Sequence, residues 1–185
     1  MVPKIVWNQS KIQILSTMCG LFQQTSLPKD QNLVAKGQTC QKLCFINKGF
    51  LRFYNDGPEK SITHWIFGPG QMITDVSSFY LDDPAKWNIQ ALSDCSLMVI
   101  DRTDYQRMRT IIPEWDQVEK LLLIKLMSAL ENRVYAFLSM SAEERFDHLF
   151  DADPDMFNQL PLQYLSSMLG MTPETLSRIR RKRIS

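Results

Sequence analysis

The chain has 185 residues, which suits one large domain or two small ones, and its 44% hydrophobic and 22% charged residues are ordinary for a soluble globular protein. The formal net charge of +1, taken over the whole chain, indicates nothing about partners. No run of about 18 apolar residues is present, so no membrane span is expected. Residues 1–11 lack the pattern of a signal peptide, and we expect a cytoplasmic location.

The first predicted region is a β domain. Residues 1–30 are ambiguous, with a short helix around 10–18 and then a strand as the best interpretation. Downstream, short runs rich in β-branched and aromatic residues alternate with turn formers such as Asn47-Lys48-Gly49 and Gly68-Pro69-Gly70. These runs cover residues 43–46, 50–54, 62–67 and 96–100. The spacing predicts an antiparallel β jelly roll or barrel over residues 1–112, in an α+β chain.

A long helix is predicted next. Residues 114–138 contain no Gly or Pro and are dominated by Leu, Glu, Lys and Met. Within them, apolar residues follow a 4-3-4-3 spacing, at Leu123, Met127, Leu130, Val134 and Phe137. An apolar band this wide needs two partners, and the barrel supplies one. We expect the same helix of a second subunit to supply the other, so 113–139 is predicted as a dimerisation helix. A helix packed wholly within its own chain is the alternative.

A separate C-terminal domain is predicted over residues 140–185. Ser139-Met140 has the position of a hinge, and Ser141-Ala142-Glu143-Glu144 has the pattern of a capping box that begins a helix ending near Phe150. Farther on, Pro161 can start a helix over 162–169. Gly170 suits the left-handed conformation that ends such a helix.

A second helix follows this glycine directly. Thr172 has the chemistry of an N-cap, Pro173 that of a first helical residue, and Glu174 is a first-turn acid that the helix dipole favours. The helix is expected to run to about Arg183. Two short helices joined by a glycine turn predict a helix-turn-helix.

The predicted second helix has two distinct faces. Leu176 and Ile179 are expected to pack on Leu165 and Leu169 of the first helix, while the small Ser166 allows a close crossing. The opposite face has hydrogen-bonding residues suited to base edges in a major groove, namely Glu174, Ser177, Arg178 and Arg181. Three cations lie outside this face and are expected to reach phosphates, namely Arg180, Lys182 and Arg183. A helical hairpin with a solvated charged face is the alternative.

The charge distribution agrees with a DNA interface. Residues 178–185 carry five cations and no acid, whereas the stretch upstream is acidic at Glu143, Glu144, Asp147, Asp151, Asp153 and Asp155. A basic tip of this kind is what a phosphate-contacting surface requires, although a solvated tail has the same composition.

The cysteines predict no cofactor. Cys19, Cys40, Cys44 and Cys95 form neither a disulfide framework nor a zinc signature, and the chain has two histidines. Packed free thiols are favoured, while a redox or iron–sulfur role stays open.

The C-terminal segment LPLQYLSSMLGMTPETLSRIR, residues 160–180, resembles the helix-turn-helix of the Crp/Fnr family, in particular the short form found in Bacteroidetes-type bacteria. The resemblance extends to residues 45–49, 75–79, 89–92 and 141–145. It implies a jelly roll of the cyclic nucleotide-binding type, a homodimer, double-stranded DNA as partner and a contact with RNA polymerase. The family's recognition residues fall on Pro173, Glu174 and Arg178, with Arg178 the best candidate for a guanine contact.

The sequence departs from the family at the ligand pocket. Members that bind cyclic AMP carry a Gly-Glu pair and an Arg-Ser pair, which here fall on Thr74-Asp75 and near Ala85-Lys86. Asp75 could still hold a hydroxyl and Lys86 could attract an anion, but the bidentate arginine clamp is absent. This predicts an apo-active regulator or a small effector other than cyclic AMP. The strands that follow the recognition helix in the family are also missing before Ser185, which predicts a loss of wing contacts.

The composition bears on two other functions. A cupin-like metal enzyme needs several histidines in the barrel, and His64 alone lies in the β region, so we predict no enzyme. A ligand-sensing adaptor whose tail is merely basic is the main alternative to a DNA-binding regulator.

Overall fold

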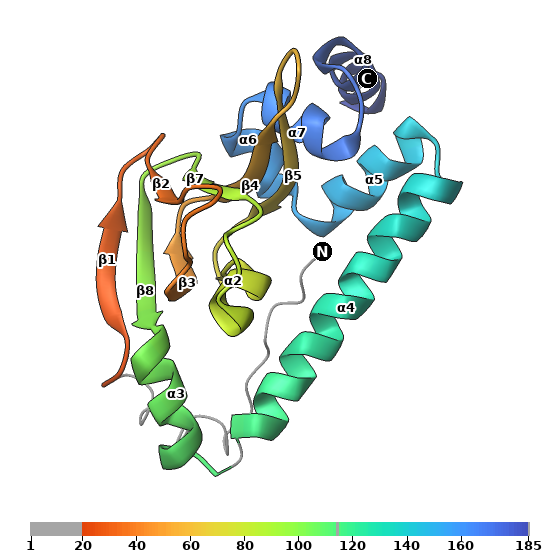
Figure 1. Ribbon diagram of the computed structural model, residues 1–185. Coiled ribbons are helices and arrows are strands. Elements are labelled where there is room, and N and C mark those ends of the chain that lie inside the picture. Colours follow the sequence, from red (N-terminus) through yellow and green to blue (C-terminus); the bar gives the residue numbers. More distant parts are fainter. Residues whose placement is uncertain (1–19, 114, 185) are drawn as a thin grey trace.

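The N-terminal half of the computed structural model, which describes residues 20–113 and 115–184, is a jelly roll of two antiparallel sheets (Figure 1). The first sheet has the order β1 (Gln23–Leu27), β8 (Cys95–Asp101), β3 (Lys42–Lys48) and β6 (Met72–Ile73). The second has the order β2 (Asn32–Val34), β7 (Asn88–Ala91), β4 (Leu51–Asp56) and β5 (Ser61–Phe67). The predicted jelly roll is confirmed. The helix expected around residues 10–18 lies outside the described residues.

The core of the jelly roll lies between the two sheets. Residues that alternate along the strands turn inward, so that Ile46, Leu51, Ile89 and Leu97 are at most 1% exposed. Cys40, Cys44 and Cys95 are buried in the same core as free thiols. The predicted packing of free thiols is therefore confirmed for these three, while Cys19 lies outside the described residues.

The sequence does not predict two short helices, one between β6 and β7 and one after β8. α2 (Val76–Leu81) is capped by Asp75, and α3 (Arg102–Ile111) is capped by Asp101, which accepts a hydrogen bond from the amide of Asp104. α3 is missed because its residues are mostly charged or polar, and its apolar side is narrow. That side packs Tyr105 and Met108 against Trp115 and other buried residues, and this contact fixes the start of the next helix.

The long helix α4 (Trp115–Ser139) runs beside the jelly roll (Figure 1). Its start and end agree with the predicted 114–138. Ala129 faces the jelly roll, whereas Met127 and Val134 are 61% and 59% exposed. The predicted apolar stripe therefore lies on the surface of the single chain. No helix in the described ranges combines the length and apolar character needed to cross a membrane.

A C-terminal helical unit follows a two-residue break at Met140-Ser141. It consists of α5 (Ala142–Ala152), α6 (Pro154–Gln159), α7 (Leu162–Leu169) and α8 (Pro173–Ile184). The predicted capping box is present, because the Ser141 hydroxyl accepts from the amide of Glu144 and the Glu144 carboxylate accepts from the amide of Ser141. α6 was not predicted. Asp153 caps it, and it buries Met156 and Phe157.

The helical unit and the jelly roll share one apolar core. Phe146 and Phe157, both at most 1% exposed, belong to the same buried cluster as Phe50, Ile66 and Leu92 of the jelly roll. The aromatic rings of Phe146 and Phe157 meet edge to face, with centroids 5.2 Å apart. The C-terminal unit is thus packed against the sheet domain and does not hang from the end of α4.

Candidate nucleic-acid interface

The turn between α7 and α8 has the geometry that the sequence predicts. Gly170 adopts a left-handed conformation with φ of 67°, and its amide donates to carbonyl oxygens of the last turn of α7. A Cβ at this position would also lie 2.7 Å from Cε1 of Phe137. Thr172 begins α8 as an N-cap, since its Oγ1 accepts from the amide of Thr175 at 3.2 Å. These contacts fix the angle between the two helices.

Apolar contacts hold α8 against α7. Leu165 and Leu176 are fully buried, and Ile179 is 7% exposed within the same cluster. Ser166 is buried between the helices, and its hydroxyl donates to the carbonyl of Gln163. The predicted packing of the two helices is confirmed, and it determines which face of α8 is left outward.

The outward face of α8 carries the residues predicted to read bases. Glu174, Arg178 and Arg181 are exposed, and Ser177 is half-buried beside them. Hydrogen bonds to the Glu174 carboxylate, from its own amide and from the Thr172 hydroxyl, lower its pKa. This face can accept hydrogen bonds through a carboxylate and donate them through guanidinium groups. Base edges in a major groove present both donors and acceptors, so the two sets of groups are complementary.

The cations at the end of α8 lie against an acidic face of α5. The Lys182 ammonium lies 3.1 Å from Oε1 of Glu143, and Nη2 of Arg183 lies 2.6 Å from Oδ1 of Asp151. Arg183 also pairs with Asp147. Both charged stretches are evident in the sequence, but their pairing is a finding of the structure. The spacing of four residues from 143 to 147 to 151, which puts three acids on one helix face, is the signal that would have suggested it.

A buried arginine joins the helical unit to the jelly roll. The Arg52 guanidinium, on β4, lies between two rings, 4.0 Å from the ring centre of Tyr54 and 4.5 Å from that of Tyr164 on α7. Burial lowers the pKa of Arg52. Nearby, the amide of Thr63 on β5 donates to the hydroxyl of Ser167 at 2.9 Å. The sequence does not predict this interface, because it depends on residues about one hundred positions apart.

Two further arginines hold the C-terminal end of α7. Nη2 of Arg133, on α4, donates to the carbonyl of Met168 at 2.8 Å, and Nε of Arg145, on α5, donates to that of Leu169 at 3.1 Å. Cations at the C-terminal end of a helix also interact favourably with the helix dipole. Burial lowers the pKa of Arg133 to about 10, so the guanidinium stays charged at neutral pH. α4 is therefore tied directly to the helix-turn-helix.

The predicted ligand positions lie together, but their polar groups bind the protein itself. Oγ1 of Thr74 donates to the carbonyl of Lys42. Oδ1 of Asp75 accepts from the amide of Ser78, and Oδ2 accepts from the amide of Lys86 at 2.8 Å. Ala85 is buried and the Lys86 side chain is exposed. α2 lies between the two predicted pairs, and Asp75 is an N-cap and loop anchor.

No metal site accompanies these residues. In residues 20–113 and 115–184, no three or more His, Cys, Asp or Glu side chains gather where they could hold a metal ion. His64, the residue considered for a cupin-like site, stacks on Trp87 instead, with ring centres 4.5 Å apart.

Comparison with known proteins agrees with this architecture. Residues 24–110 match the model of the cyclic nucleotide-binding domain. No curated protein matches the chain. Among solved structures, the chain is similar to a mutant of CooA from Carboxydothermus hydrogenoformans, with 17% identity over 98% of this chain and 86% of that one, and a TM-score of 0.72.

Two other solved structures show the same similarity over most of their length. FixK2 from Bradyrhizobium japonicum shares 17% identity over 87% of this chain and 83% of its own, with a TM-score of 0.70. The catabolite activator protein of Thermus thermophilus shares 20% identity over 92% of this chain and 82% of its own, with a TM-score of 0.53. The chain therefore has the fold of Crp/Fnr-type regulators, and its residues 24–110 match the cyclic nucleotide-binding domain.

Proposed function

We propose that the protein is a homodimeric, DNA-binding transcription regulator of the Crp/Fnr type that reads the major groove with α8, over residues 173–183. One observation carries the proposal. α8 is anchored to α7 by Leu176 and Ile179, while Glu174 and Arg178 on its opposite side are exposed. An arginine on the outer face of a recognition helix can bind the O6 and N7 atoms of a guanine at the same time.

The exposed stripe of α4 supports the homodimer. Leu123, Met127, Leu130, Val134 and Phe137 are 37% to 61% exposed in the single chain and lie on one side of the helix. An isologous contact between two such helices buries both stripes and relates the two α8 helices by a two-fold axis. Dimers of this kind bind half-sites about one turn of DNA apart. In this proposal, residues 1–112 sense, 113–139 dimerise and 140–185 read DNA, and the bound dimer contacts RNA polymerase.

DNA selection followed by a salt titration tests this function. Duplexes of random sequence, about 20 base pairs long, are selected on the purified protein, and binding of the enriched duplex is followed by fluorescence anisotropy. We expect one enriched two-fold sequence and an affinity that falls steeply between about 50 and 200 mM salt, because bound phosphates release counterions. No enriched sequence together with a flat salt response would favour the ligand-sensing adaptor.

Arg178→Ala is expected to relax the base preference at one position in each half-site. The lost bidentate contact costs about 1–3 kcal/mol of discrimination, and binding to unrelated duplexes should change little. Anisotropy with the selected duplex and with single-base variants measures the effect. Arg107→Ala is the control, because Arg107 is an exposed arginine on α3, away from α8. An unchanged preference in Arg178→Ala would remove this residue from base reading.

Asp147→Asn combined with Asp151→Asn is expected to strengthen DNA binding. The change releases Arg183 from its ion pairs. One additional phosphate contact should raise the affinity roughly fivefold near 0.1 M salt. It should also steepen the slope of log affinity against log salt concentration by the amount expected for about one phosphate contact. Adding Arg183→Ala should abolish the gain. If the gain persists without Arg183, the general loss of negative charge causes it, and Arg183 is not a phosphate contact.

A further inference from the structure

A hollow of about 610 Å³ lies between the jelly roll and α4. Half of its lining residues on the jelly-roll side are aromatic, namely Phe53, His64, Trp65, Phe67, Tyr80 and Trp87. The opposite wall is formed by leucines of α4, at 123, 126 and 130. This volume is in the range of small-molecule sites, and its lining is predominantly apolar.

The charged groups of the hollow are poorly suited to a cyclic phosphate. Among the described residues that line it, the ionisable acid is Asp75 and the lysine is Lys86, and none is an arginine. Both carboxylate oxygens of Asp75 already accept hydrogen bonds from α2 and from the amide of Lys86. A phosphate bound here would lose its water without gaining a bidentate partner, which is costly in an apolar site.

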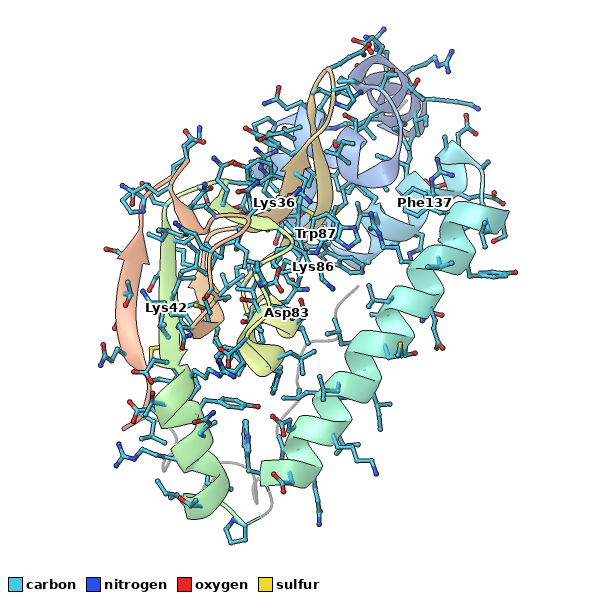
Figure 2. All side chains as sticks on the ribbon, in the orientation of Figure 1. Lys36, Lys42, Asp83, Lys86, Trp87 and Phe137 are labelled. Carbon is cyan, nitrogen blue, oxygen red and sulfur yellow. The ribbon has the colours of Figure 1, made fainter. Side chains whose placement is uncertain are left out.

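The hollow instead presents a flat aromatic surface. The rings of His64 and Trp87 are nearly parallel, at 11°, with centres 4.5 Å apart. Burial, and then the charge of Arg133, lowers the pKa of His64. The imidazole is therefore neutral at pH 7 and adds no charge to the wall. Figure 2 shows Lys86 and Trp87 in the loop region of the jelly roll between its sheets and α4.

We infer that this hollow binds an uncharged, planar aromatic molecule, which stacks beside the His64–Trp87 pair under the leucines of α4. The size, the apolar wall and the missing phosphate clamp all favour this ligand class over a cyclic nucleotide. The inference rests on the proposed function in one respect. Leu123 and Leu130 belong both to this wall and to the proposed dimer contact, so the partner helix covers the mouth of the site.

The site also has a direct connection to the DNA-reading helices. The Arg133 guanidinium lies 4.8 Å from the ring centre of Trp65, a wall residue of the hollow, and donates to the carbonyl of Met168 in α7. A ligand that changes the position of Trp65 therefore acts on the same arginine that holds the helix-turn-helix. This makes the bound aromatic molecule an effector of the proposed regulator.

Calorimetry with 2-naphthol and with cyclic AMP tests the ligand class. 2-Naphthol is planar and uncharged at pH 7, whereas cyclic AMP joins a planar purine to an anionic cyclic phosphate. We expect saturable binding of 2-naphthol and none of cyclic AMP. Trp87→Ala should weaken 2-naphthol binding about tenfold or more, because a stacking face is lost. Leu126→Trp should block it by filling the hollow, while melting curves check that both variants are folded.

Two controls separate this result from the proposed function. Tyr135→Ala removes an exposed aromatic of α4 outside the hollow, and Arg178→Ala affects the DNA face alone, so both should bind 2-naphthol normally. A failure of DNA binding therefore leaves the ligand assay intact. Micromolar binding of cyclic AMP, no binding of 2-naphthol, or 2-naphthol binding that Trp87→Ala leaves unchanged would each overturn the inference.

Discussion

The double variant Met127→Glu, Val134→Glu is expected to be monomeric and to bind the selected DNA at least about 100-fold more weakly than the unchanged protein. These two side chains are one heptad apart, and they are the most exposed members of the apolar stripe on α4. Two glutamates on each helix would place four carboxylates within the proposed interface, where neither water nor cations compensate them. Analytical ultracentrifugation measures the dimer, and anisotropy measures the DNA affinity.

The matched control is Ser128→Glu, Tyr135→Glu. It introduces the same charges at the same spacing of seven residues, about a quarter turn around the helix, where both positions are exposed. We expect this variant to stay dimeric and to bind DNA with little change. If the stripe variant also remains a dimer with normal affinity, α4 is not the dimer interface, and the alternative of a helix packed within its own chain would stand.

Phe146→Ala is expected to reduce the free energy of unfolding by about 3–5 kcal/mol. Phe146 is fully buried, and its ring contacts those of Phe150 and Phe157 at centroid distances of 5.6 and 5.2 Å. Removing it leaves a cavity in the cluster that joins the C-terminal unit to the jelly roll. Because part of that cluster positions α7 and α8, DNA binding should fall as well. Urea unfolding, followed by circular dichroism, measures the stability.

Tyr135→Ala is the control for this loss of an aromatic side chain. Tyr135 is 66% exposed, so its removal should change the stability by no more than about 0.5 kcal/mol. A loss of less than about 1 kcal/mol in Phe146→Ala would show that the cluster does not contribute to the stability of the whole chain as the structure implies.

The elements that the sequence predicted well have local causes. The ends of the helix-turn-helix follow from the left-handed Gly170 and the N-cap Thr172, which act on neighbouring backbone groups. The long helix follows from uninterrupted helix formers and the spacing of its apolar residues. The strands of the jelly roll follow from short β-branched and aromatic runs between turns. α3 and α6 have no such pattern, and packing after their Asp caps decides them.

The candidate sites were predictable to different degrees for the same reason. The outward face of α8 depends on the helical period alone, so the positions of Glu174 and Arg178 could be derived from spacing. The roles of Arg52 and Arg133 could not, because their partners come from distant segments of the chain. The hydrogen bonds of Asp75 to α2 and to Lys86 likewise depend on the closure of a loop. Their geometry is a property of the tertiary structure.

The core shared by Phe50, Ile66 and Leu92 with the helices of the C-terminal unit limits the modularity of this protein. A chimera that grafts residues 140–185 onto another sensor would leave those jelly-roll side chains without their apolar cover, and the grafted unit would lose the same contacts. If α8 reads DNA as proposed, its specificity is therefore more readily exchanged by substitutions on the outer face of α8 than by recombination of whole domains.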